Sequence, residues 1–96
     1  MASKKELTLK VKVSRGLFAN ERGISLELPD GRTIAAFVDK RDVIVDRDPR
    51  AGEEIKGKVK VSMVKKKKGA AIIDLPQPTI TGGPRVLVPQ ALLSSD

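Results

Sequence analysis

The sequence contains neither cysteine nor histidine. Their absence excludes disulfides, thiol nucleophiles, zinc sites of the usual kind and imidazole acid–base catalysis. A chain without cysteine fits a cytoplasmic location. Its first ten residues, MASKKELTLK, lack the apolar run of a signal peptide, and no segment approaches transmembrane length. We therefore expect a cytoplasmic protein that is not an enzyme, holds no cofactor or metal and makes no contact with a membrane.

Aromatic residues are almost absent too: the chain has two, Phe18 and Phe37, and no Trp or Tyr. The apolar residues are mostly Val, Ile, Leu and Ala, so the core must be aliphatic. A nucleic-acid binder that stacks bases on aromatic side chains has very little to stack them on here.

Positive charge, by contrast, is plentiful and unevenly distributed, within a formal net charge of +7. Residues 1–19 hold five Lys and Arg against one Glu, and residues 55–75 hold seven Lys against one Asp. Residues 20–54, between them, hold six Lys and Arg against nine Asp and Glu. Segregated charge of this kind produces a directed field, which suggests an oppositely charged partner.

The richest segment is IKGKVKVSMVKKKKGAAIIDL, from Ile55 to Leu75. Its first part alternates apolar and cationic residues, as expected of a strand with one buried and one solvent face. Lys65 to Lys68 and a glycine then form the expected tip of a hairpin. A shorter strand, Leu7 to Val13, shows the same alternation. The solvent faces of these two strands carry Lys10, Lys12, Lys56, Lys58 and Lys60.

Lysine is a flexible point charge, whereas arginine is a planar fork that reads phosphates or guanine edges. An all-lysine segment therefore predicts contacts with phosphates that do not depend on base sequence. Two alternatives remain open at this stage. The lysines could guard edge strands against aggregation, or the hairpin could dock an acidic protein.

The loop LFANERG, which follows Arg15-Gly16, offers a second candidate contact. We expect Phe18 to plug the open end of a small barrel. The alternative is an exposed ring beside Arg15 and Arg22 that stacks on a base.

Carboxylates provide no convincing catalytic pair. Glu53 with Glu54, and Asp39 with Asp42, are the nearest approach to one, but nothing nearby builds a pocket between two carboxyl groups. We expect these acids to pair with the cations beside them, Lys40, Arg41, Arg47 and Arg50.

Short alternating runs with turn signals predict an all-β fold. The strongest signal is a hairpin around Pro29-Asp30-Gly31, with a return strand from Thr33 to Val38 that we expect to be covered on both sides. Residues 1–96 should form one small barrel domain, OB- or SH3-like, with five or six mostly antiparallel strands. A helical turn should start at Pro89, and residues 1–5 and 94–96 should be frayed. The expected core is Leu7, Leu9, Val11, Val13, Ile24, Leu26, Leu28, Ile34, Ala36, Val38, Ile55, Val59, Val61, Ile73 and Val86.

Two segments resemble OB-fold proteins such as bacterial translation initiation factor one. LELPDGRTIAAFV is similar to that family's strand–turn–strand, and AGEEIKGKVKVSMVKKKKGAAIIDL to its following turn, strand and basic hairpin. The resemblance covers Ile24 to Leu75 and implies a small β-barrel. The LFANERG loop and the tail after Pro76 have no counterpart in it.

The sequence thus predicts a small β-barrel that binds nucleic acid without catalysis, favouring RNA or single-stranded DNA over duplex. The rival hypothesis is a protein-interaction or assembly subunit, which would bind an acidic protein or a second copy of itself. The predicted nucleic-acid contacts are Lys10, Lys12, Lys56, Lys58, Lys60, Lys65, Lys66, Lys67, Lys68, Arg15, Phe18 and Arg22.

Overall fold

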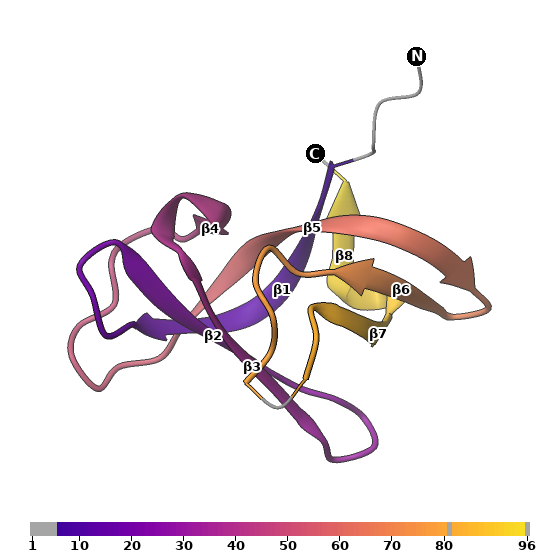
Figure 1. The fold of residues 1–96 in the computed structure, drawn as a ribbon, viewed down its shortest axis with the longest axis horizontal. Helices are drawn as coiled ribbons and strands as arrows, with labels where there is room; N and C mark the ends of the chain where they lie inside the picture. Colours follow the sequence, from indigo (N-terminus) through magenta and orange to yellow (C-terminus); the bar gives the residue numbers. More distant parts are fainter. Residues whose placement is uncertain (1–5, 81, 96) are drawn as a thin grey trace.

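The computed structural model describes residues 6–80 and 82–95, which form one curled antiparallel sheet shaped as a half-barrel (Figure 1). The all-β prediction is confirmed. The strands are β1 (Glu6–Arg15), β2 (Glu21–Glu27), β3 (Thr33–Asp39), β4 (Val43–Ile44), β5 (Ile55–Lys67), β6 (Ala70–Asp74), β7 (Arg85–Pro89) and β8 (Leu93–Ser95), with 3-10 turns η1 (Lys40–Asp42) and η2 (Gln90–Leu92).

Six strands follow the order β3-β2-β1-β5-β6-β7, and two short strands join this path from the side. β4 pairs with β5, and β8 pairs with β1. The predicted helical turn is η2, which begins just after Pro89. Both helical segments in the described part of the chain are single turns, far too short to traverse a lipid bilayer.

The end of the chain differs from expectation, because Ser94 and Ser95 are paired rather than frayed. They lie opposite Thr8 and Leu7 of β1. β2 pairs with β1 only from Lys12 onward, so the first half of β1 has an open edge whose backbone groups β8 satisfies. Residues 1–5, also expected to be frayed, and Asp96 lie outside the described residues.

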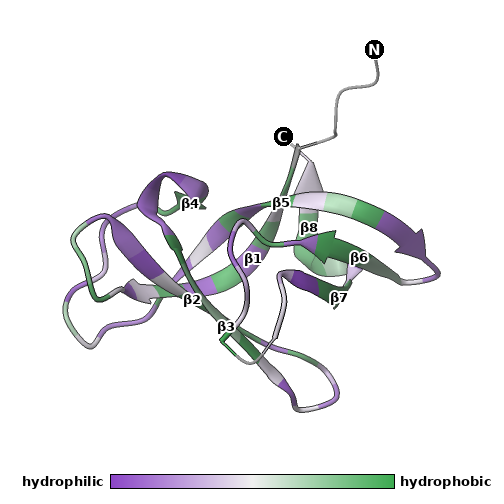
Figure 2. Cartoon of the chain, viewed as in Figure 1, coloured by the Kyte–Doolittle hydropathy of each residue, from purple (hydrophilic) through white to green (hydrophobic). Residues whose placement is uncertain are grey.

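The long strands β1 and β5 pair from Glu6↔Ser62 to Val13↔Ile55 and form the centre of the sheet. Because side chains alternate along each strand, one face is apolar and the other polar, and Figure 2 shows β5 ending in a hydrophilic stretch. Leu26, Ile34, Ile55 and Val86 of the predicted core are half-buried around it, and the rest of that core is buried. Ala71, Leu75 and Val88 are buried as well, and the sequence analysis missed them.

The segment after β6 closes the open side of the half-barrel. Leu75 is buried, Thr79 forms an isolated bridge with Ala36, and the Ile80 N–H donates to the Ala35 carbonyl at 2.8 Å. The segment thus pairs with the free edge of β3, the last strand of the sheet on this side. The expectation that β3 is covered on both sides is wrong, since Phe37 is 40% exposed.

Gly57 of β5 is packed closely against β1 and against the residues at the end of β4. A Cβ atom there would lie 2.7 Å from Val45 Cγ1, 2.8 Å from Val13 Cγ2 and 3.0 Å from the Ile44 carbonyl oxygen. Only glycine lets β4 and its following residues approach β5 this closely.

Gly57→Ala is therefore expected to lower the free energy of unfolding by about 1–3 kcal/mol through overpacking. Gly83→Ala is the matched control, because a Cβ there would meet nothing within 4 Å. It should change stability by no more than about 0.5 kcal/mol. Urea denaturation of both variants checks this, and equal stabilities would contradict the packing at Gly57.

The loop between β4 and β5 is held by an arginine clamp. The Arg47 guanidinium donates to both Glu53 carboxylate oxygens, at 2.8 and 2.7 Å, and the Arg50 backbone N–H donates to Glu53 at 2.9 Å. These bonds lower the pKa of Glu53 from 4.5 to about 2, with the Arg47 hydrogen bonds as the largest cause. The predicted pairing of the loop acids with nearby cations is confirmed here and for Arg41 with Asp39.

A carboxyl group whose pKa is lowered by folding stabilises the folded state above its unfolded pKa, and this contribution is lost as the pH falls toward the folded pKa. Glu53→Gln should therefore be less stable than the wild type at pH 7. The difference should shrink between about pH 4.5 and pH 2. Thermal unfolding across this range measures it, and a difference that stays constant would contradict the clamp.

Candidate nucleic-acid interface

The two lysine rows are neighbours in the sheet. In the β1–β5 pairing, Lys10 lies directly opposite Lys58, and Lys12 lies directly opposite Lys56. Lys60 continues the β5 row opposite Thr8. Directly opposed residues of an antiparallel pair share a face, so the rows merge into one cationic surface, here called the lysine face.

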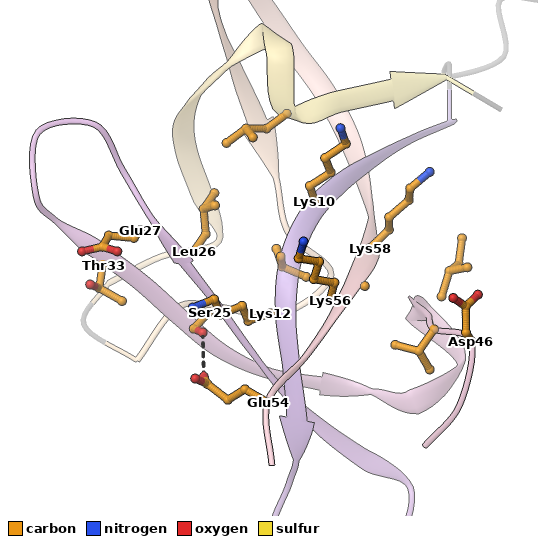
Figure 3. Close-up of a pocket in the computed structure, with 15 residues that line it drawn as sticks. Lys10, Lys12, Ser25, Leu26, Glu27, Thr33, Asp46, Glu54, Lys56 and Lys58 are labelled. Carbon is orange, nitrogen blue, oxygen red and sulfur yellow. Dashed lines mark hydrogen bonds between the residues drawn. The ribbon is translucent and has the colours of Figure 1, made fainter. Parts of the chain in front are cut away.

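Part of the lysine face is hollowed into an open groove with a cavity volume of about 1110 Å³ (Figure 3). Lys10, Lys12, Lys56 and Lys58 lie in its middle, and we call it the lysine groove. In Figure 3, Leu26, Glu27 and Thr33 of the β2–β3 hairpin lie on one side of the lysines, and Asp46, which follows β4, lies on the other. Leu92 of η2 also lines the groove. The lysines of the two strands therefore lie within a concave site rather than on a flat surface.

The groove lysines form none of the ion pairs found among the described residues. In the described ranges, the ion pairs are Arg22–Asp48, Arg32–Asp30, Arg41–Asp39, Arg47–Glu53 and Arg85–Asp74, so each uses an arginine. Like charges directly opposite one another destabilise a sheet. In each of the two Lys–Lys pairs of the groove, the lysines should therefore repel each other, and a bound anion would reduce this repulsion.

Three carboxylates lie at the border of the groove, those of Glu27, Asp46 and Glu54. Figure 3 shows Glu27 and Asp46 on opposite sides of the lysines. The Ser25 hydroxyl donates to Glu54 at 3.2 Å, which positions this carboxylate beside β2. The acids confine the positive region to a strip along β1 and β5.

The tip of the β5–β6 hairpin is shorter than the sequence analysis expected. β5 continues to Lys67, so only Lys68 and Gly69 form the turn. A register shift between Met63 and Lys65 exchanges the faces on which the later residues of β5 lie. Lys66 consequently pairs with the buried Ala71, while Lys65 and Lys67 pair with Ile72 and Ala70 on the face that the groove lysines share.

The predicted contacts in the β1–β2 loop are placed apart from the groove. Arg22 is only 9% exposed, and its guanidinium donates to the carbonyls of Ala19 and Glu21 and to Asp48. It therefore serves the loop rather than a ligand. The Arg15 side chain is exposed, and its Nε donates to the Pro49 carbonyl at 3.1 Å.

Phe18 does not plug the barrel, as we had expected, but is 69% exposed. The loop folds back on itself, because the Glu21 N–H donates to the Phe18 carbonyl and Glu21 Oε1 accepts from the Leu17 N–H at 2.7 Å. Pro49, whose carbonyl accepts a hydrogen bond from Arg15 of β1, is fully buried.

Sequence reasoning missed Ser25, Glu27, Thr33 and Glu54 as groove residues. They come from β2, from β3 and from the residue before β5, which meet only through the pairing of β2 with β3 and of β1 with both β2 and β5. Among the residues that the structure describes, no cluster of three or more Asp and Glu side chains could hold a metal ion.

Comparison of the chain with protein-family models, curated proteins and solved structures found no match.

Relief of the repulsion between Lys10 and Lys58 should be measurable in the free protein. Lys10→Gln is expected to raise the free energy of unfolding by about 0.2–1 kcal/mol at low salt. Lys40→Gln is the control, since Lys40 is an exposed residue of η1 with no lysine opposite it. Denaturation at low and high salt tests this: the gain should vanish when salt screens the pair. A loss of stability at low salt would contradict the repulsion.

Proposed function

We propose that this protein binds nucleic acid without catalysing a reaction on it, through contacts between its groove lysines and phosphates. The observation that supports this most directly is the two cross-strand lysine pairings in an open groove, Lys10 with Lys58 and Lys12 with Lys56. None of these lysines takes part in the ion pairs of the described residues. A chain of phosphates would neutralise both pairs together. A cytoplasmic location belongs to the same proposal.

Protection against aggregation is a weaker explanation for these lysines, because it applies to edge strands. Lys12 has β5 on one side and β2 on the other, and Lys58 lies between β1 and β4. Both residues are thus in the interior of the sheet. A function in ligand binding accounts for cations at positions that are paired on both sides.

The all-lysine composition of the groove favours phosphate contact without base readout. Lysine lacks the planar fork that arginine uses for guanine edges. In the described part of the chain, the arginines are largely engaged in ion pairs. We therefore infer that binding is independent of base sequence and strongly dependent on salt.

The test compares two variants of equal charge. One carries Gln at the four groove positions (Lys10, Lys12, Lys56, Lys58), and the other carries Gln at Lys65–Lys68. Each is titrated with labelled single-stranded RNA, single-stranded DNA and duplex DNA at several salt concentrations. For single strands, each neutralised phosphate contributes about −0.7 to the slope of log K against log salt. Replacing four lysines should therefore make this slope shallower by about 3 in the groove variant.

The hairpin variant should lose less, because Lys66 faces away from the groove lysines. Equal losses in both variants would attribute binding to net charge rather than to the groove. Wild-type binding that is absent even at low salt would refute the proposed function.

Assembly is a second candidate function, favoured by the open edge of β7. Among the described strands, β7 pairs only with β6, and its Leu87 is 45% exposed. An edge of this kind can add a strand from another chain. Light scattering in low and high salt measures self-association, and the titration above measures affinity for nucleic acid. A stable oligomer that binds no nucleic acid would favour assembly.

A further inference from the structure

Phe37, one of only two aromatic residues in the chain, lies on the lysine face. In the pairing of β3, β2 and β1, Phe37 is opposite Gly23, which is opposite Ser14. In the adjacent row, Ala35 is opposite Ser25, which is opposite Lys12. Because residues two apart on a strand share a face, the Phe37 and Lys12 side chains project from the same side of the sheet.

The separation between these residues suits one nucleotide. Phe37 is two strands from β1 and one step of two residues from the Lys12 row. With strands about 4.8 Å apart and about 3.3 Å per residue, the two Cα atoms are about 12 Å apart. At this distance, the base of one nucleotide can lie on the Phe37 ring while its phosphate lies at the end of the Lys12 side chain.

The Phe37 ring lies next to Gly23 of the neighbouring strand β2. A Cβ atom on Gly23 would lie 2.8 Å from Ser14 Oγ and 3.7 Å from Phe37 Cε1. The ring thus lies beside a residue without a side chain, and Phe37 is 40% exposed. Phe18 is also exposed, but its loop lies beyond the end of β1, outside the strand rows that carry the lysines.

We propose that Phe37 stacks on an unpaired base of a single-stranded nucleic acid whose phosphates lie along the groove lysines. This inference rests on the proposed function and adds the ligand class. Stacking on an aromatic side chain requires a base that is free of its partner, so duplex is disfavoured. Glu54, bonded to Ser25 between Lys12 and Ala35, repels phosphate from that part of the face and keeps the backbone over the lysines.

The experiment separates phosphate contacts from base contacts. Wild-type protein and the Phe37→Leu variant are titrated with a single-stranded oligonucleotide and with an abasic oligonucleotide of the same length. Leucine keeps an apolar contact with Gly23 but removes the ring. Phe18→Leu is the matched control, and urea denaturation verifies that each variant is folded.

The wild type and Phe18→Leu should bind the base-containing strand about five- to tenfold more tightly than the abasic strand, a modest share of what stacking supplies. Phe37→Leu should bind both strands with the affinity that the wild type has for the abasic one. Phe37→Trp, which keeps an aromatic ring at this position, should keep the preference for the base-containing strand. It provides a second test if the leucine variant is unstable.

Other outcomes would overturn the inference in distinguishable ways. If the wild type binds both strands equally, or if Phe37→Leu keeps the preference, the lysines bind phosphate but Phe37 does not stack. If the preference is lost in Phe18→Leu instead, the base lies on the β1–β2 loop. If neither strand binds at low salt, the proposed function fails together with the inference.

Discussion

The antiparallel pairing of β1 with β5 is the interaction on which the rest of the structure depends. It runs from Glu6↔Ser62 to Val13↔Ile55, and every other part of the sheet joins one of these two strands directly or through a neighbour. The same register places Leu7, Leu9, Val59 and Val61 in the core. A slip by one residue would exchange the apolar and cationic faces of a strand, so burial of the apolar face strongly specifies the register.

That register also creates the candidate site at some cost to stability. It brings lysine opposite lysine in two consecutive pairs on the polar face. The hydrophobic face compensates for this repulsion, because Leu9 and Val59 are almost completely buried directly opposite each other. Core packing and the clustering of the groove lysines are thus two consequences of one strand pairing, on opposite faces of the same pair of strands.

Arginine and lysine have different positions in this molecule. Arginines form the ion pairs of the described residues, such as Arg47 with Glu53 in the β4–β5 loop and Arg85 with Asp74 across β6 and β7. The lysines of the groove and of the β5–β6 hairpin take part in none of these ion pairs of the described residues. The division agrees with their chemistry, since a planar guanidinium holds a carboxylate through two hydrogen bonds, whereas an ammonium on a flexible chain adapts to a mobile anion.

The sequence by itself determined the strand class, the hairpins and which face of each long strand is cationic, because the period of two is a local property of the chain. It could not determine that β1 lies beside β5, that a bulge after Met63 turns Lys66 away, or that Phe18 and Phe37 are exposed. These features depend on contacts between residues far apart in the chain. Only the tertiary structure decided them, because the burial of one apolar face selects the neighbour of each strand, and that neighbour decides which side chains share a surface.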